Sequence, residues 1–317
     1  MMPRPPYVSV VDPIGPAIER VKMILFRPFS LERWFVIGFC AWLAHLAERA
    51  GGGGGGVPGR GSANFPPSAG QARDFAINNL YWIAPVGVFV ALVVIALALL
   101  LVWLRSRGQF MFLYCVAQNK AEVKNPWHLF RSYGNSLFAF RVVFGILAFL
   151  TMSVFLGVGV MAFVAWRARP ELAAASIAAM VACGTLLVAA MLVAGVVTKL
   201  TKDFVVPLMY LHTASAVQGW RILLDLLSFN KARVVLYLLF QIVIDLVIGA
   251  IVVAAACVTC CCAACLMLVP YIGTVVLLPI YSFQQAYALY YLAQYGPEFN
   301  LFAPALPVNP PVAPPSM

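Results

Sequence analysis

Long runs of apolar residues dominate this chain and predict transmembrane helices. Residues 81–104, 137–166 and 172–198 are almost free of charge, and the middle run carries only Arg141 near its start. An α-helix rises about 1.5 Å per residue, so about 20 apolar residues cross a hydrocarbon core of roughly 30 Å. Each of these three runs is therefore long enough to span a membrane once.

The apolar stretch at residues 234–280 is too long for one span. As a single helix it would measure about 70 Å, more than twice the thickness of the core. Pro270 and Gly273 are the expected break points. They predict a fifth span at residues 234–256 and a sixth at residues 273–293, with a turn between them.

The short apolar run at residues 34–48 is assigned by counting charges. With this run as a first span, sixteen lysines and arginines lie on one side of the membrane and five on the other. Without it, the two sides carry nearly equal numbers. Because cytoplasmic loops are enriched in lysine and arginine, the sequence predicts six spans with both termini in the cytoplasm.

Composition agrees with a membrane protein and excludes a water-soluble one. Hydrophobic residues make up 63% of the chain and charged residues 10%, with a mean hydropathy of +0.93, whereas soluble domains average about 45–50% apolar and about 25% charged. The net charge of +10 is explained by cations beside the anionic inner leaflet. No soluble basic domain is present, so membrane lipids rather than nucleic acid are the expected partners.

The predicted fold class is therefore all-α, a polytopic transmembrane helical bundle. One six-span domain is expected over residues 1–303, with a glycine-rich outer loop at residues 50–72. Residues 304–317 are rich in proline and are expected to form a disordered cytoplasmic tail.

A pattern of proline, aromatic residue and arginine recurs before alternate spans. The matching residues are Pro28, Phe29 and Arg33, then Pro126, Trp127 and Arg131. A weaker relative, with glycine in place of proline, follows at Trp220 and Arg221. This predicts three tandem units, each an interfacial elbow followed by a transmembrane hairpin. The alternative is that aromatic and basic residues coincide at the interface, as they do in membrane proteins generally. An apolar stripe upstream predicts an amphipathic helix in the membrane plane, through Ile14, Ile18, Val21 and Leu25.

Asp245 lies about 16 Å into the fifth predicted span, near the middle of the membrane. An acid at this depth costs about 2.5–3.5 kcal/mol on insertion scales, so it should face the bundle interior or water. One interpretation is a proton- or cation-coupling site. The other is a hydrogen bond to a polar residue of a neighbouring helix that fixes the packing. The candidate polar site comprises Asp245, Gln241, Tyr281, Gln284 and Gln285.

Five cysteines cluster in the turn expected before the sixth span, namely Cys257, Cys260, Cys261, Cys262 and Cys265. Gaps of two residues resemble thiolate metal ligation, but alanine, valine and leucine surround these cysteines. Packing as small apolar side chains is the favoured interpretation. A disulfide and a metal site are the alternatives, and no cofactor is expected.

No pattern in the chain predicts catalysis. His45, His128 and His212 stand apart and are expected to be interface or packing residues. Nucleophile elbows, zinc-hydrolase helices and EF-hand loops are absent from the sequence. The inner acids, Asp203 among them, stand beside basic residues and are expected on solvated faces. The sequence therefore predicts a protein that is not an enzyme.

Two segments carry a resemblance to a known family. Pro-Phe-Ser-Leu-Glu-Arg-Trp-Phe at residues 28–35 and the tyrosine-rich residues 287–298 resemble six-span bacterial membrane proteins similar to the membrane domain found beside some glycerophosphodiester phosphodiesterases. The catalytic domain of those enzymes is absent here, so their activity is not implied. The resemblance implies a multi-pass protein of the bacterial inner membrane.

Two hypotheses about function follow. The first is a non-enzymatic membrane module that binds lipid, a protein partner or a second copy of itself, and the interfacial helices favour it. The second is a small secondary transporter that uses Asp245 as its coupling residue, favoured by the acid at mid-membrane and by the parallel repeats.

Overall fold

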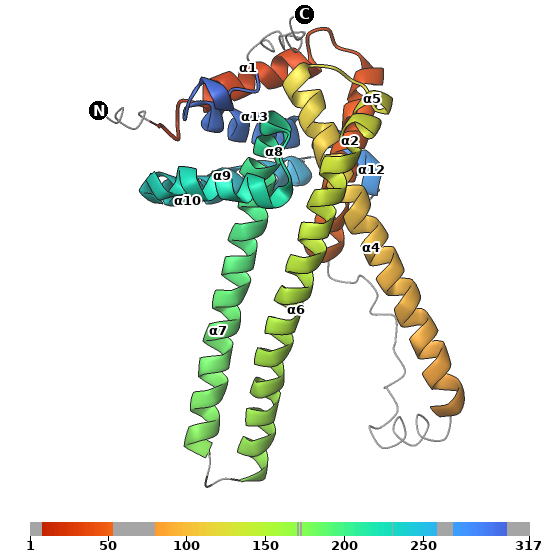
Figure 1. Cartoon of the computed structure of the whole chain (residues 1–317), viewed down its shortest axis with the longest axis vertical. Helices are drawn as coiled ribbons and strands as arrows, with labels where there is room; N and C mark the ends of the chain where they lie inside the picture. Colours follow the sequence, from red (N-terminus) through yellow and green to blue (C-terminus); the bar gives the residue numbers. More distant parts are fainter. Residues whose placement is uncertain are drawn as a thin grey trace, which may run out of the picture.

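A computed structural model describes residues 8–52, 80–169, 171, 173–229, 231–258 and 269–302. All regular secondary structure in these residues is helical, which confirms the all-α class. Three long helices extend away from a cluster that the other helices form, as Figure 1 shows. The long helices are α4 (Leu80–Gln118), α6 (Arg131–Ala168) and α7 (Ala173–Leu200).

We call this cluster the head, and it includes the end of α4 that follows residue 104. Its other members are α1 (Ile14–Leu25), α2 (Leu31–Gly52), α5 (Lys124–Leu129), η2 (Thr201–Val205), α8 (Val206–His212), α9 (Ala216–Phe229), α10 (Lys231–Val258), α12 (Pro270–Val276), α13 (Leu278–Ala293) and η3 (Pro297–Phe299). We call residues 84–104 of α4, 142–166 of α6 and 173–198 of α7 the legs.

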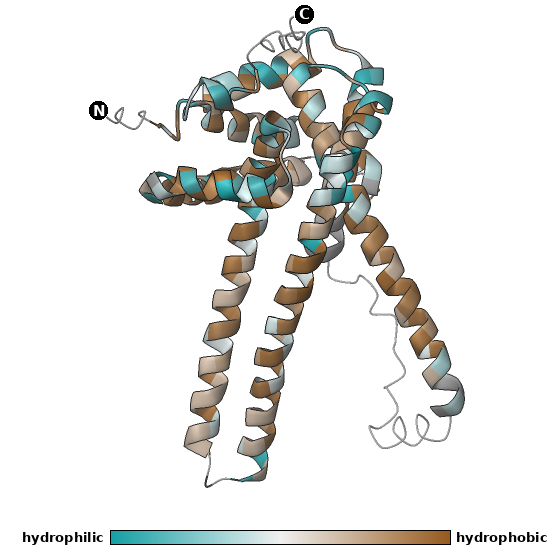
Figure 2. Cartoon of the chain, viewed as in Figure 1, coloured by the Kyte–Doolittle hydropathy of each residue, from teal (hydrophilic) through white to brown (hydrophobic). Residues whose placement is uncertain are grey.

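The legs present bare apolar surface. Large side chains such as Phe89, Phe149 and Leu192 are 67%, 68% and 66% exposed, and Figure 2 shows these helices as hydrophobic over most of their length. A helix that is apolar on all sides is stable when lipid surrounds it. The legs correspond to the predicted second, third and fourth spans.

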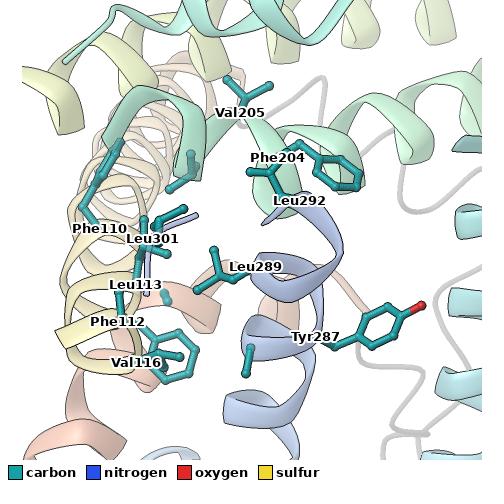
Figure 3. Packing of buried hydrophobic residues seen from close by; sticks show 14 of the residues in the cluster. Phe110, Phe112, Leu113, Val116, Phe204, Val205, Tyr287, Leu289, Leu292 and Leu301 are labelled. Atoms are coloured by element: carbon teal, nitrogen blue, oxygen red, sulfur yellow. The ribbon is translucent and has the colours of Figure 1, made fainter. Parts of the chain in front are cut away.

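The head holds the buried core. Phe110 and Leu113 of α4, Phe204 of η2 and Leu289 of α13 are 2% exposed or less, and Figure 3 shows them in one region of the interior. Arg20 of α1 ties that helix to the carboxyl end of α4. Its Nη2 donates to Val116 O at 3.0 Å and to the next carbonyl at 2.5 Å, and burial lowers the pKa of its guanidinium.

The predicted amphipathic helix is present as α1. Val21 and Leu25 of the apolar stripe are buried, at 8% and 1% exposure, whereas Ile18 is 42% exposed. The buried face therefore includes Ala17 and Ile24 in place of Ile18. The stripe is rotated by part of a turn from the predicted one because α1 packs on α13.

Four helices in the described residues are long and apolar enough to cross a membrane, namely Ala84–Gln118, Arg131–Ala168, Ala173–His212 and Lys231–Val258. The predicted first span coincides with α2, which is 22 residues long but has charged residues near both ends. The predicted sixth span is broken at Leu277 into α12 and α13, of 7 and 16 residues. Six spans and three tandem units are therefore not confirmed.

The orientation of α10 differs from that expected of a fifth span. In Figure 1, α9 and α10 lie across the direction of α6 and α7. Most of the second half of α10 is exposed, as Leu246, Ile251 and Val253 show at 73%, 59% and 63%. In this arrangement α10 does not run beside the legs, although its length and composition suit a membrane.

Candidate functional site

A network of polar side chains forms where α7 passes through η2 into α8. At η2 the helix widens to a π-helical turn, in which the N–H of Val206 bonds Thr201 O. Pro207 follows directly, and because proline lacks an N–H it leaves the carbonyl of Asp203 without its α-helical donor. Such turns are found often at functional sites, and this one carries Asp203.

Asp203 is buried, with 6% of its surface exposed. The hydroxyl of Tyr237 donates to Asp203 Oδ2 at 3.1 Å, and Gln241 Nε2 donates to the same hydroxyl at 3.0 Å. Lys199 Nζ lies 3.6 Å from Asp203 Oδ2. A buried carboxylate is stable only when it is paired and hydrogen-bonded, and these contacts meet both conditions.

Asp245 joins the same network from α10. Its Oδ1 accepts a hydrogen bond from Gln284 Nε2 at 2.8 Å, and its Oδ2 lies 4.0 Å from Lys199 Nζ. Lys199 therefore stands between two carboxylates, one buried and one whose side chain is 51% exposed. At this exposure the Asp245 pair is a weak one, worth about 0–1 kcal/mol.

The structure brings together three of the five predicted site residues, namely Asp245, Gln241 and Gln284. The hydrogen bond from Gln284 is one that the packing interpretation names, and a coupling role for Asp245 stays a prediction. Tyr281 lies elsewhere, with its ring centroid 4.3 Å from that of His45. Gln285 is half-buried on α13 and has no side-chain hydrogen bond to the network in the described part of the chain.

Sequence reasoning missed the best-buried members of this site. Asp203 was expected on a solvated face, and its burial contradicts that expectation. The available signals were the spacing of Lys199 and Asp203, one helical turn apart, and Tyr237 one turn before Gln241.

Of the histidines, His45 is buried at 3% exposure and its Nε2 lies 3.0 Å from Lys202 Nζ.

The three predicted elbows have different local structures. Pro28 and Phe29 lie in the turn between α1 and α2, and Phe29 is 59% exposed. Arg33 follows in α2 and donates to the carbonyl and side-chain oxygens of Asn119, both at 3.0 Å.

The second elbow forms α5 and the start of α6. Pro126 is buried, and Trp127 lies edge-on to Trp103 at 5.9 Å, with the Arg107 guanidinium 4.3 Å from the Trp103 ring and 4.9 Å from the Trp127 ring. Arg131 is exposed at the first residue of α6.

The third elbow lies within α9. Trp220 packs on Phe140 at 6.0 Å, and Arg221 is exposed. A turn, a helix of six residues and the first half of a 14-residue helix share no local geometry, so the motif alone does not define a repeated unit.

Only Cys257 of the cysteine cluster belongs to the described residues, and it is exposed near the end of α10. Cys260, Cys261, Cys262 and Cys265 lie outside them. Within the described residues no group of histidine, cysteine and acidic side chains is arranged to hold a metal ion. Packing, disulfide and metal interpretations of the cluster all stay predictions.

Residues 8–273 match a family of unknown function (DUF7544). The chain belongs to this family. The matched segment includes the legs and Lys199, Asp203 and Asp245, but it ends before α13. No curated protein and no solved structure matches the chain. The resemblance to the membrane domain found beside glycerophosphodiester phosphodiesterases stays a prediction, because the family match shows no link to it.

Proposed function

We propose that the protein is a non-enzymatic component of the bacterial inner membrane that binds membrane lipid through its legs and the adjoining face of its head. The positive charges at the head end of the three legs are the main observation in support of this proposal. The apolar segments of α4, α6 and α7 meet the head at Arg105, Arg141 and Lys199 respectively. Each cation near an anionic leaflet contributes about 1 kcal/mol of attraction, while the exposed apolar side chains favour acyl chains.

In this proposal both termini and the head face the cytoplasm, except for α2, which crosses the membrane as the predicted first span, because an even number of crossings returns the chain to the side on which it began. Most lysines and arginines of the described chain belong to the head, as the positive-inside rule requires. The far ends of α6 and α7 are joined near Arg167 and Arg169 and face the opposite side.

The test measures lipid on the full-length protein. The protein is purified in a mild detergent, the detergent is exchanged repeatedly, and retained lipid is measured by mass spectrometry. We expect retained lipid, and a Tm that rises when bacterial lipid is added, because a ligand of the folded state stabilises it. Complete loss of lipid together with an unchanged Tm on addition would contradict the proposal.

A small transporter is the second candidate, and the position of Lys199 between Asp203 and Asp245 favours it. Ionisable residues within a membrane-embedded region commonly mark ion pathways. The test is proton flux into proteoliposomes that contain a trapped pH-sensitive dye. Flux that is lost in Asp245→Asn and in Asp203→Asn would support transport. No flux above that of empty liposomes would support the lipid-binding module.

A further inference from the structure

A layer of polar side chains lies between α4 and α6 where both helices enter the head. Arg141 of α6 reaches across to α4, where its Nη1 donates to Ser106 Oγ at 3.2 Å and its Nη2 to Gln109 Oε1 at 2.5 Å. Ser106 and Gln109 are buried, with 0% and 5% of their surface exposed. These hydrogen bonds fix the guanidinium of Arg141 between the two helices.

Gln109 has a donor that no group in the described part of the chain satisfies. Its Oε1 accepts from Arg141, but its Nε2 is buried and has no hydrogen-bond partner in the described residues. Buried N–H groups are strongly favoured to be paired, so an acceptor oxygen beside this amide would be stabilising. Arg105 lies one turn earlier on the same face of α4 and adds a second positive charge. The layer therefore suits a ligand that is anionic and rich in acceptor oxygens.

An apolar groove begins at Arg141 and continues along the legs. It has a volume of about 540 Å³ and is lined by Leu99 and Val102 of α4 and by Ile146 and Phe149 of α6, with Arg141 at the head end. No acidic side chain lines the groove in the described chain. The groove opens on leg surface that faces lipid, so a hydrocarbon chain can enter it from the side.

We propose that one anionic phospholipid of the cytoplasmic leaflet binds here, with its phosphate held by Arg141 and Gln109 and one acyl chain in the groove. This inference rests on the proposed function and names the class of lipid and its site. A guanidinium matches the geometry of phosphate oxygens. Trp103 and Trp127, which meet at 5.9 Å beside this end of α4, are of the residue type that favours headgroup level.

Blocking the apolar groove distinguishes a bound lipid from a bound phosphate ion. Inorganic phosphate would use the hydrogen-bond donors of Arg141 and Gln109 but would not need the groove. Gly145 lines the groove, and no atom lies within 4 Å of a Cβ built there. Gly145→Phe therefore places a ring in the groove, and its Cβ has no side-chain atom of Arg141 within 4 Å. Gly157 lies on the same helix with equally open surroundings but does not line this groove, so Gly157→Phe is the matched control.

The experiment titrates the full-length protein in detergent with phosphatidylglycerol or phosphatidylcholine and measures binding by native mass spectrometry. The wild-type protein should bind phosphatidylglycerol at least about tenfold more tightly than phosphatidylcholine, since both carry a phosphate but the choline cation of phosphatidylcholine would be repelled by Arg105 and Arg141. Arg141→Gln should remove most of that preference. Gly145→Phe should weaken both lipids about tenfold, whereas Gly157→Phe and Arg221→Gln should stay within about twofold of wild type.

The possible outcomes test the lipid site separately from the proposed function. Equal affinity for the two lipids, or unchanged binding in both Arg141→Gln and Gly145→Phe, overturns this site, while retained lipid still supports the proposed function. Binding that depends on Arg141 but not on Gly145 indicates a phosphate contact without an acyl groove and also overturns it. If Arg141→Gln does not fold, Gly145→Phe alone decides. Absence of lipid from the wild-type protein overturns both proposals.

Discussion

The close contact of α2 with α4 makes Gly108 the most sensitive glycine of the head. A Cβ at this position would lie 2.5 Å from Leu43 Cβ, 2.6 Å from Leu43 C and 2.7 Å from Ala44 N. Apolar atoms pack best at about 3.5–4.0 Å, so Gly108→Ala must push the two helices apart by about 1 Å. Two of these three neighbours are backbone atoms, so no side-chain rotation can relieve the contact.

The expected magnitude follows from two opposing effects. Overpacking of this kind costs about 1–3 kcal/mol, and backbone neighbours place Gly108→Ala at the upper end. Alanine in a helix gains up to about 1 kcal/mol over glycine. We therefore expect the free energy of unfolding to fall by about 2 kcal/mol. Gly157→Ala has nothing within 4 Å of its Cβ, so it measures the helix propensity of alanine without overpacking. It should raise the free energy of unfolding by up to about 1 kcal/mol.

The assay is reversible unfolding in mixed micelles, followed by far-ultraviolet circular dichroism and tryptophan fluorescence as sodium dodecyl sulfate is added. The two variants should change stability in opposite directions. If Gly108→Ala is as stable as the wild type or follows Gly157→Ala, then α2 does not approach α4 as described and the reasoning fails.

Three further predictions concern single contacts. Tyr237→Phe removes the donor of the buried Asp203 and should lower the free energy of unfolding by about 1–3 kcal/mol in the same unfolding assay. Arg20→Ala leaves two carbonyls at the end of α4 without this donor and should speed hydrogen exchange in α1, measured by mass spectrometry. Cys40 and Cys115 are buried free thiols with their sulfur atoms 3.9 Å apart, so both should react with a maleimide only after denaturation.

Each of these three predictions has a result that would contradict it. Tyr237→Phe with unchanged stability would show that the hydroxyl bond to Asp203 contributes nothing. Exchange that rises equally in α9 and α1 would show that Arg20→Ala acts on the whole head. The exposed Cys257 should be labelled in the native protein, and labelling of Cys40 at the same rate would contradict the buried core.

The helices of the legs could be predicted because lipid imposes a simple requirement on them. A chain that crosses hydrocarbon must be apolar over about 20 residues. The predicted range 137–166 falls within α6, and the predicted range 172–198 begins one residue before α7 and otherwise falls within it. The end of α4 could not be predicted from hydropathy. Beyond residue 104 the helix continues to Gln118 through Ser106, Arg107 and Gln109, because the helices of the head bury these residues.

The candidate site could be predicted only in part. Helices from distant parts of the chain bury some of its polar residues, and this burial leaves no pattern in the neighbouring sequence. Asp245 and Gln241 stood out as polar residues in an apolar run. Asp203 did not, since Lys199 and Lys202 nearby resemble a solvated surface in the sequence. Its burial depends on α10, which brings Tyr237 against η2 from a distant part of the chain.

The measurement that tests the account most directly is the sidedness of the two ends of the legs. Single cysteines replace Arg169, at the α6–α7 turn, and Lys124, in α5 of the head, in a protein whose native cysteines are removed. A membrane-impermeant maleimide is then applied to intact cells from which any outer membrane has been removed. We expect labelling at position 169 without further treatment, and at position 124 only after the inner membrane is permeabilised. Labelling of both positions from the same side would contradict a cytoplasmic head with membrane-spanning legs.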